Sequence, residues 1–238
     1  MTERHEGQFR GFSRKTFRFL CDIGRHNDKA WFEAHRADYE EYVLQPLRDL
    51  VGDLAHFMLS IDLSFEVTPA VGKTISRIYR DTRFSEDKRP FRDCMWIVFK
   101  RSGQEWSRYI PGYFLEINPS SYRYGLGFYD AAPKLMARFR QQIDEEPNTF
   151  LKAVAWFGTQ ETYTLHGETY KRPIGQDKPE PIRTWYRFKS FYLSCDRPFD
   201  DAILSPRFAG QLMKHFSLAA PLYHYVHEIA AQVLSQRR

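Results

Sequence analysis

The sequence has little cysteine and no long apolar run. Its three cysteines, Cys21, Cys94 and Cys195, lie far apart, and none belongs to a C-x-x-C pair. Such a sparse, odd set predicts reduced thiols in a reducing compartment rather than a disulfide framework. No apolar stretch approaches the roughly 20 residues that a membrane-spanning helix needs, and residues 1–11 are too polar for a secretory signal. We therefore expect a cytoplasmic protein that makes no membrane contact.

The motifs of common catalytic machineries are also missing. There is no G-x-S-x-G elbow and no P-loop, and Gly125-x-Gly127 lacks the third glycine and the following helix of a dinucleotide-binding turn. His224 and His227 are spaced to share a metal on a helix, but no third ligand at useful spacing accompanies them. The sequence therefore predicts no metal site and identifies neither a nucleophile nor a cofactor.

Aromatic residues, in contrast, are abundant, and the charge is mildly basic. Twenty Phe, 14 Tyr and 5 Trp make up 16% of the chain, which favours a broad sheet with large side chains on its faces. The net charge is +5, from 35 Lys and Arg against 30 Asp and Glu. This bias permits an anionic partner, but it lacks the dense stripe of one sign that is typical of nucleic-acid-coating proteins.

Hydrophobic periodicity predicts helices at both ends of the chain and strands between them. Apolar residues recur at helical spacing up to about residue 61 and again after residue 130. Between these positions, apolar and polar residues alternate with a period near two. This order predicts an α+β fold, in which N-terminal and C-terminal helices pack on a central, mainly antiparallel sheet. We expect residues 1–11 to form a flexible leader and residues 12–238 to form a single α+β domain.

Capping and turn signals place several elements. Ser13 is a natural N-cap for the first helix, Asp130 for a later one, and Pro46 either begins a helix or kinks the preceding one. A hairpin is expected at 163–171, followed by a proline-rich loop. Strands are expected at 64–68, 74–79, 95–101, 113–118, 122–129 and 190–194, and the last two helices at 205–216 and 221–236.

Residues 77–92 carry the strongest charge signal. Five arginines and one lysine stand among three acids, at the end of a predicted strand and in the loop after it. Two interpretations remain open. The acids Asp81, Glu86 and Asp87 could neutralise their neighbours in a structural ion-pair network, or the surplus arginines could capture carboxylate or phosphate with their planar forks. Aromatic Phe84 and Phe91 should tie the loop to the core.

The spacing within this stretch resembles that of a known family. The pattern R-x-x-R-D-x-R-F-x-x-D-K-x-P, which begins at Arg77, is similar to the signature of the widespread bacterial family called domain of unknown function 2461. Phe91 stands where that family usually has tyrosine. The resemblance implies no established reaction, substrate or cofactor. The resemblance to this family extends to segments outside the motif, which occur in the same order: Trp31-Phe32, Gly112-Tyr113-Phe114, Gly125-Leu126-Gly127, Lys171-Arg172-Pro173 and Lys189-Ser190-Phe191.

We expect the motif to bind an anionic or phosphate-bearing small molecule. The anion would be held by four cations of the motif: Arg77, Arg80, Arg83 and Lys88. Asp81 would orient the arginines, and Tyr79 and Tyr113 would line the site. Lys171 and Lys189 would add positive charge if the sheet brings them to the motif.

Two other functions stay open. One is a phosphate-ester hydrolase whose metal ligands the sequence does not display. The other is a non-catalytic interaction or RNA-binding module, whose binding would weaken steeply with salt. In addition, Gly125 and Gly127 share one face of a predicted strand, where either a ligand or a packing group could approach the backbone.

Overall fold

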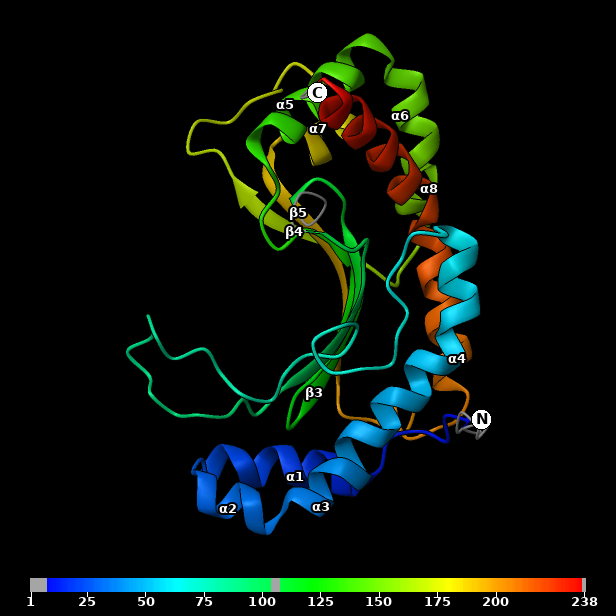
Figure 1. Cartoon of the computed structure of the whole chain (residues 1–238). Helices are drawn as coiled ribbons and strands as arrows, with labels where there is room; N and C mark the ends of the chain where they lie inside the picture. The colour runs from blue at the N-terminus through cyan, green and yellow to red at the C-terminus, as the bar shows by residue number, and fades with distance from the viewer. Residues whose placement is uncertain (1–7, 104–107, 237–238) are drawn as a thin grey trace. The chain divides into compact units, whose positions relative to one another are not determined.

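The computed structural model describes residues 8–103 and 108–236, and it confirms the α+β class (Figure 1). Five strands form one antiparallel sheet in the order β1-β2-β3-β5-β4. The strands are β1 (Met95–Phe99), β2 (Gly112–Ile117), β3 (Ser121–Gly127), β4 (Thr164–Thr169) and β5 (Phe188–Pro198). No helix in the described ranges is both long and apolar enough to span a membrane.

Most helices precede β1 or follow β3. The N-terminal set is α1 (Arg14–Arg25), α2 (Lys29–Ala34), α3 (Arg36–Tyr39), the π-helical turn η1 (Glu40–Leu44) and α4 (Gln45–Ile61). The later set is α5 (Pro133–Glu145), α6 (Pro147–Val154), the 3₁₀ turn η3 (Ala155–Thr159), α7 (Glu180–Tyr186) and α8 (Phe208–Ser235).

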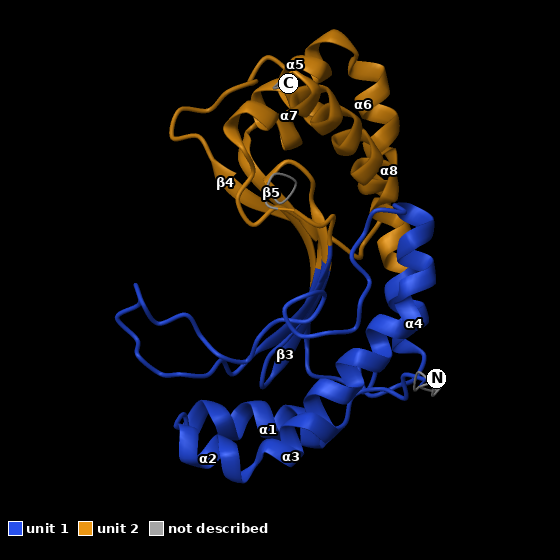
Figure 2. Cartoon of the chain, in the orientation of Figure 1, with its two compact units in different colours: residues 1–99, 114–124, 196–213 blue, residues 100–113, 125–195, 214–238 orange. Residues whose placement is uncertain are grey.

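The chain divides into two compact units, each assembled from separate segments (Figure 2). Unit 1 comprises residues 1–99, 114–124 and 196–213, and unit 2 comprises residues 100–113, 125–195 and 214–238. Unit 1 contains the N-terminal helices and the arginine-rich stretch, and unit 2 contains α5, α6 and α7.

The N-terminal helices of unit 1 follow from local sequence signals. The Ser13 side chain accepts a hydrogen bond from the Thr16 backbone, and the Thr16 hydroxyl accepts one from the Ser13 backbone, which together make a capping box. Pro46 is the second residue of α4, and the chain is helical on both sides of it, because η1 runs directly into α4. The turn before it is widened into η1. Residues 1–7 of the expected leader lie outside the described residues, while Phe9 is buried and its backbone N–H donates to Asp53.

Several predicted elements were wrong in detail. Residues 64–68 and 74–79 form no regular strand. In the second segment the Ser76 hydroxyl, rather than a backbone carbonyl, accepts the N–H of Trp96, and only isolated bridges form. The expected hairpin at 163–171 is a single strand, β4, which pairs with β5 along its length. Ala132, not Asp130, occupies the N-cap position of α5.

Proline caused two further errors. The proline-rich loop contains a helix, α7, since Pro181 falls in its first turn, where proline is compatible with helical geometry. The two expected C-terminal helices are one helix, α8, which continues through Pro221.

Candidate functional site

The arginine-rich stretch forms a long loop that projects from unit 1 (Figure 1). Its base is closed by a β-bridge between Tyr79 and Phe91. The Arg80 N–H donates to the Pro90 carbonyl and the Arg92 N–H donates to the Ile78 carbonyl, both at 2.8 Å. The two ends of the loop are therefore held together by backbone hydrogen bonds.

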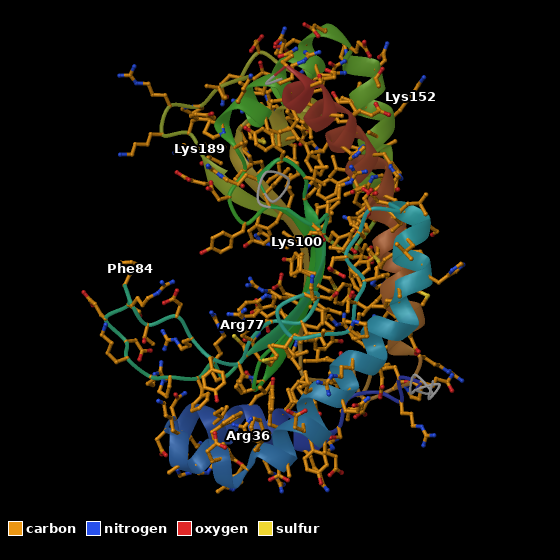
Figure 3. All side chains as sticks on the ribbon, viewed as in Figure 1. Arg36, Arg77, Phe84, Lys100, Lys152 and Lys189 are labelled. Carbon is orange, nitrogen blue, oxygen red and sulfur yellow. The ribbon has the colours of Figure 1, made fainter. Side chains whose placement is uncertain are left out.

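Phe91 ties this base to the N-terminal helices. Its ring is buried and stacks on Phe32 of α2, with the ring centroids 4.5 Å apart. The Asn27 side chain accepts the Phe91 N–H at 2.9 Å and donates to the Phe91 carbonyl at 3.0 Å. Phe84 behaves in the opposite way from our expectation: it is 95% exposed at the free end of the loop and does not anchor it (Figure 3). The loop is thus fixed at its base and open to solvent at its tip.

Two acids of the loop are engaged by arginines. Asp81 accepts two side-chain hydrogen bonds from Arg83, at 2.9 and 2.7 Å. These bonds, together with the Arg83 backbone N–H, lower the pKa of Asp81 to about 2. The Asp87 carboxylate accepts from Arg89 at 2.7 Å and also from Arg80, so its pKa is held well below the usual range. The structural ion-pair network is therefore present and holds three of the five arginines.

Arg77 and Arg92 remain outside this network. Among the described residues, neither makes an ion pair, and both lie next to the base of the loop (Figure 3 shows Arg77). The Arg92 guanidinium lies over the Trp96 ring, 4.7 Å from its centroid, and its buried Nε atom has no hydrogen-bond partner in the part of the chain that the structure describes. Lys88 donates to the Thr82 carbonyl at 3.0 Å. The base of the loop thus keeps positive charge that its acids do not neutralise.

The sequence did not predict a group of hydrogen-bonded polar side chains on and next to strands β2 and β3. Glu116 of β2 accepts from Arg123 of β3 at 2.9 Å and from Asn118 at 3.2 Å. Burial raises the pKa of the nearby Cys94 thiol to about 11, and the negative charges of Glu116 and Asp93 add to this effect. The alternation in β2 could have predicted that Glu116 lies on the less buried face of the sheet. Glu116 stands between the buried Leu115 and Ile117 in an otherwise apolar strand.

The predicted site residues divide between the two units. Tyr79 is 46% exposed beside the loop base, where its ring packs on Phe32 and Phe91. Tyr113, in unit 2, is fully buried against Phe216 and Tyr223 and belongs to the core of that unit.

The two lysines also lie in unit 2. Lys189 pairs with Glu168 and lies 5.6 Å from the Tyr170 ring centroid, while Lys171 is exposed. We therefore build the candidate site from unit 1 residues alone.

The two glycines of β3 lie against the neighbouring strand. A Cβ at Gly125 would lie 1.8 Å from the Leu193 carbonyl oxygen of β5, and one at Gly127 would lie 2.1 Å from the Tyr192 Cβ. The space beside them is thus filled by β5, in keeping with the packing interpretation.

Comparison of the sequence with models of known protein families gives one match over most of the chain. A family model described as "Conserved hypothetical protein (DUF2461)" matches residues 15–225. The chain belongs to this family. The match covers the arginine-rich loop, the strands beside it and most of α8. None of the curated proteins compared with the sequence matches it. Membership of the DUF2461 family therefore supplies a fold relationship but no activity.

Proposed function

We propose that the base of the arginine-rich loop binds a small phosphate-bearing ligand, with Arg77 and Arg92 as its anchors. The proposal rests on one observation: three of the five arginines are held by Asp81 and Asp87, while Arg77 and Arg92 make no ion pair in the described part of the chain. A guanidinium without a carboxylate is a ready partner for phosphate, since its planar fork donates two parallel hydrogen bonds.

The paired residues have a supporting role in this proposal. Asp81 fixes Arg83, and Asp87 fixes Arg80 and Arg89, so the loop keeps its shape without using Arg77 or Arg92. Lys88 donates to a backbone carbonyl, and no described carboxylate forms an ion pair with it. Trp96 supports the Arg92 guanidinium from below, which reduces the conformational freedom that Arg92 loses on binding.

Thermal-shift and calorimetric titrations with phosphate, pyrophosphate and adenosine monophosphate test this proposal. We expect at least one of these compounds to raise the melting temperature, because a ligand that binds only the folded state stabilises it. Arg77→Gln and Arg92→Gln should each weaken that binding about tenfold or more, a loss of about 1.4 kcal/mol. Arg207→Gln, at an exposed arginine of unit 1 outside the loop, serves as the matched control.

Two results would count against phosphate binding. One is the absence of any thermal shift with all three compounds at matched ionic strength. The other is a shift that Arg77→Gln, Arg92→Gln and Arg207→Gln leave equally intact, because the ligand would then lie elsewhere.

The exposed ring of Phe84 favours a second candidate, contact with single-stranded RNA. Its ring is 95% exposed, and the Arg83 guanidinium lies 5.8 Å from its centroid. An exposed ring among cations suits an unpaired base, which stacks on the ring while the cations meet the phosphates. Under this proposal, a fluorescein-labelled 12-nucleotide RNA binds with an affinity that falls steeply with salt, and Phe84→Ala weakens it several-fold. Binding that Phe84→Ala leaves unchanged would refute this role.

A further inference from the structure

A groove along α1 is lined by residues other than those of the arginine-rich loop. It has a volume of about 460 Å³ and belongs entirely to unit 1. Phe17 and Phe199 form its apolar floor, with their ring centroids 4.4 Å apart. The Phe199 backbone N–H donates to the Ser120 carbonyl at 2.9 Å, which fixes this part of the floor. The groove is shallow and largely open to solvent, unlike the enclosed pockets that bind compact small molecules.

The rim of the groove carries three arginines and one acid, Asp22, and is therefore basic on balance. Arg14, Arg18 and Arg25 come from one side of α1 and all line the groove. Arg18 makes no ion pair within the described ranges. Arg14 meets Asp201 at 3.5 Å with both side chains largely exposed, and Arg25 meets Asp22 at 3.9 Å. Such long, solvated ion pairs contribute little to stability. The rim arginines can therefore give them up to bind the carboxylates of a ligand.

The shape of the groove favours a peptide over a compact ion. From Arg14 to Arg25 the helix rises roughly 16 Å, which equals the length of about five residues of extended chain. The two adjacent rings of the floor, Phe17 and Phe199, offer nothing to phosphate or to a sugar–phosphate backbone, whereas they can bury aliphatic side chains. The arginines on the rim can pair with carboxylates that alternate with those side chains.

We propose that this groove binds an acidic peptide segment of another protein, with aliphatic side chains on Phe17 and Phe199 and carboxylates on the three rim arginines. This interaction is separate from phosphate binding at the loop base, and either can exist without the other.

Fluorescence anisotropy with the full chain and three labelled 12-residue peptides tests the groove. The first peptide alternates glutamate with leucine, the second has serine in place of leucine, and the third has glutamine in place of glutamate. We expect the first to bind at least tenfold more tightly than either of the others. Arg18→Glu should weaken its binding at least tenfold, and so should Arg25→Glu, which provides a second variant if Arg18→Glu fails to fold.

Lys29→Glu is the matched control, because it makes the same charge change at an exposed position of unit 1 outside the groove. The Lys29→Glu variant should bind the first peptide with an affinity within twofold of that of the unaltered chain. Equal binding of the first two peptides would overturn the proposal, because charge alone would then suffice. Unchanged binding by both arginine variants would also overturn it. So would a 12-nucleotide single strand that binds more tightly than any peptide and is weakened by Arg18→Glu, since the groove would then serve nucleic acid.

Discussion

Asp81 and Asp87 differ from ordinary surface carboxylates because each accepts paired hydrogen bonds from arginine within a few residues of chain. Both carboxylates are exposed to solvent to a substantial degree, so the geometry of these bonds, rather than burial, governs their titration. The loop therefore owes its local order to hydrogen bonds that persist only while the carboxylates stay ionised.

Asp81 should titrate near pH 2, below the value of about 3.9 for a free aspartate. Since its pKa is lower in the folded state, its contribution to stability is present above about pH 4 and is lost as the pH falls through about 2. Carbon-13 NMR of the side-chain carboxyl measures this directly. Arg83→Gln should raise the pKa toward the ordinary value, and a carboxyl that titrates near pH 4 in both proteins would contradict the geometry described for this pair.

Cys94 should be a slow thiol at neutral pH. Its pKa of about 11 leaves almost no thiolate, the reactive form, near pH 8. Iodoacetamide labelling followed by mass spectrometry should therefore show a rate at Cys94 that keeps rising with pH to about 11. Glu116→Gln removes a negative charge beside the thiol and should speed labelling, whereas Glu161→Gln, at an exposed site in unit 2, should not. Half-maximal labelling of Cys94 near pH 8.5, the ordinary value, would refute the assignment.

At the scale of elements, the close approach of β3 and β5 should be sensitive to a single added carbon. Gly125→Ala would place a methyl group 1.8 Å from the Leu193 carbonyl oxygen, so one strand must move. We expect a loss of about 2 kcal/mol in the free energy of unfolding, measured by urea denaturation. Gly158→Ala is the control, because nothing lies within 4 Å of its added carbon. Its effect should stay within about 0.5 kcal/mol, and equal losses in the two variants would argue against the tight strand contact.

The sequence predicted elements well where one local signal was decisive. Ser13 caps α1 as expected, and the period of Leu47, Leu50 and Leu54 buries one face of α4. Prediction failed where tertiary contacts decide. Nothing local distinguishes a proline that ends a helix from Pro221, which α8 accommodates in its interior. Likewise, β4 depends on pairing with β5 to be a strand, because its six residues are all exposed or half-buried and show no alternation.

The residues of the candidate site could be predicted from the sequence, but the ion pairs among them could not. The excess of arginine over acid is visible in the sequence, and so are the acids that could neutralise it. Which arginine meets which carboxylate depends on the closure of the loop by Tyr79 and Phe91, a contact across twelve positions. For that reason the sequence did not single out Arg92, which makes no ion pair among the described residues, and the exposure of Phe84 was the reverse of what its hydrophobicity indicated.

At the scale of the whole molecule, continuous elements link the two units along the chain. Helix α8 runs from Phe208 to Ser235, while the division between the units falls at Met213 and Lys214 within it. A helix interrupted at such a point would lose hydrogen bonds on both sides, so we expect the units to unfold together.

Native-state hydrogen exchange with mass spectrometry tests this cooperativity. The slowest amides of α4, in unit 1, and of the last turns of α8, in unit 2, should report the same free energy of opening. A difference of about 2 kcal/mol or more between them would show that the units unfold independently.

The backbone clamp beneath residues 80–90 also bears on how much of the loop sequence the fold of unit 1 requires. Because the Arg80–Pro90 and Arg92–Ile78 hydrogen bonds involve no side chain, they place no demand on the identity of the residues above them. A segment of different sequence and length can be spliced between the clamped ends while the scaffold below stays intact. The scaffold below therefore does not depend on the side chains of the R-x-x-R-D-x-R-F-x-x-D-K-x-P pattern between the clamped ends, so replacing residues 82–88 should change the surface chemistry of the tip and leave the folding of unit 1 intact.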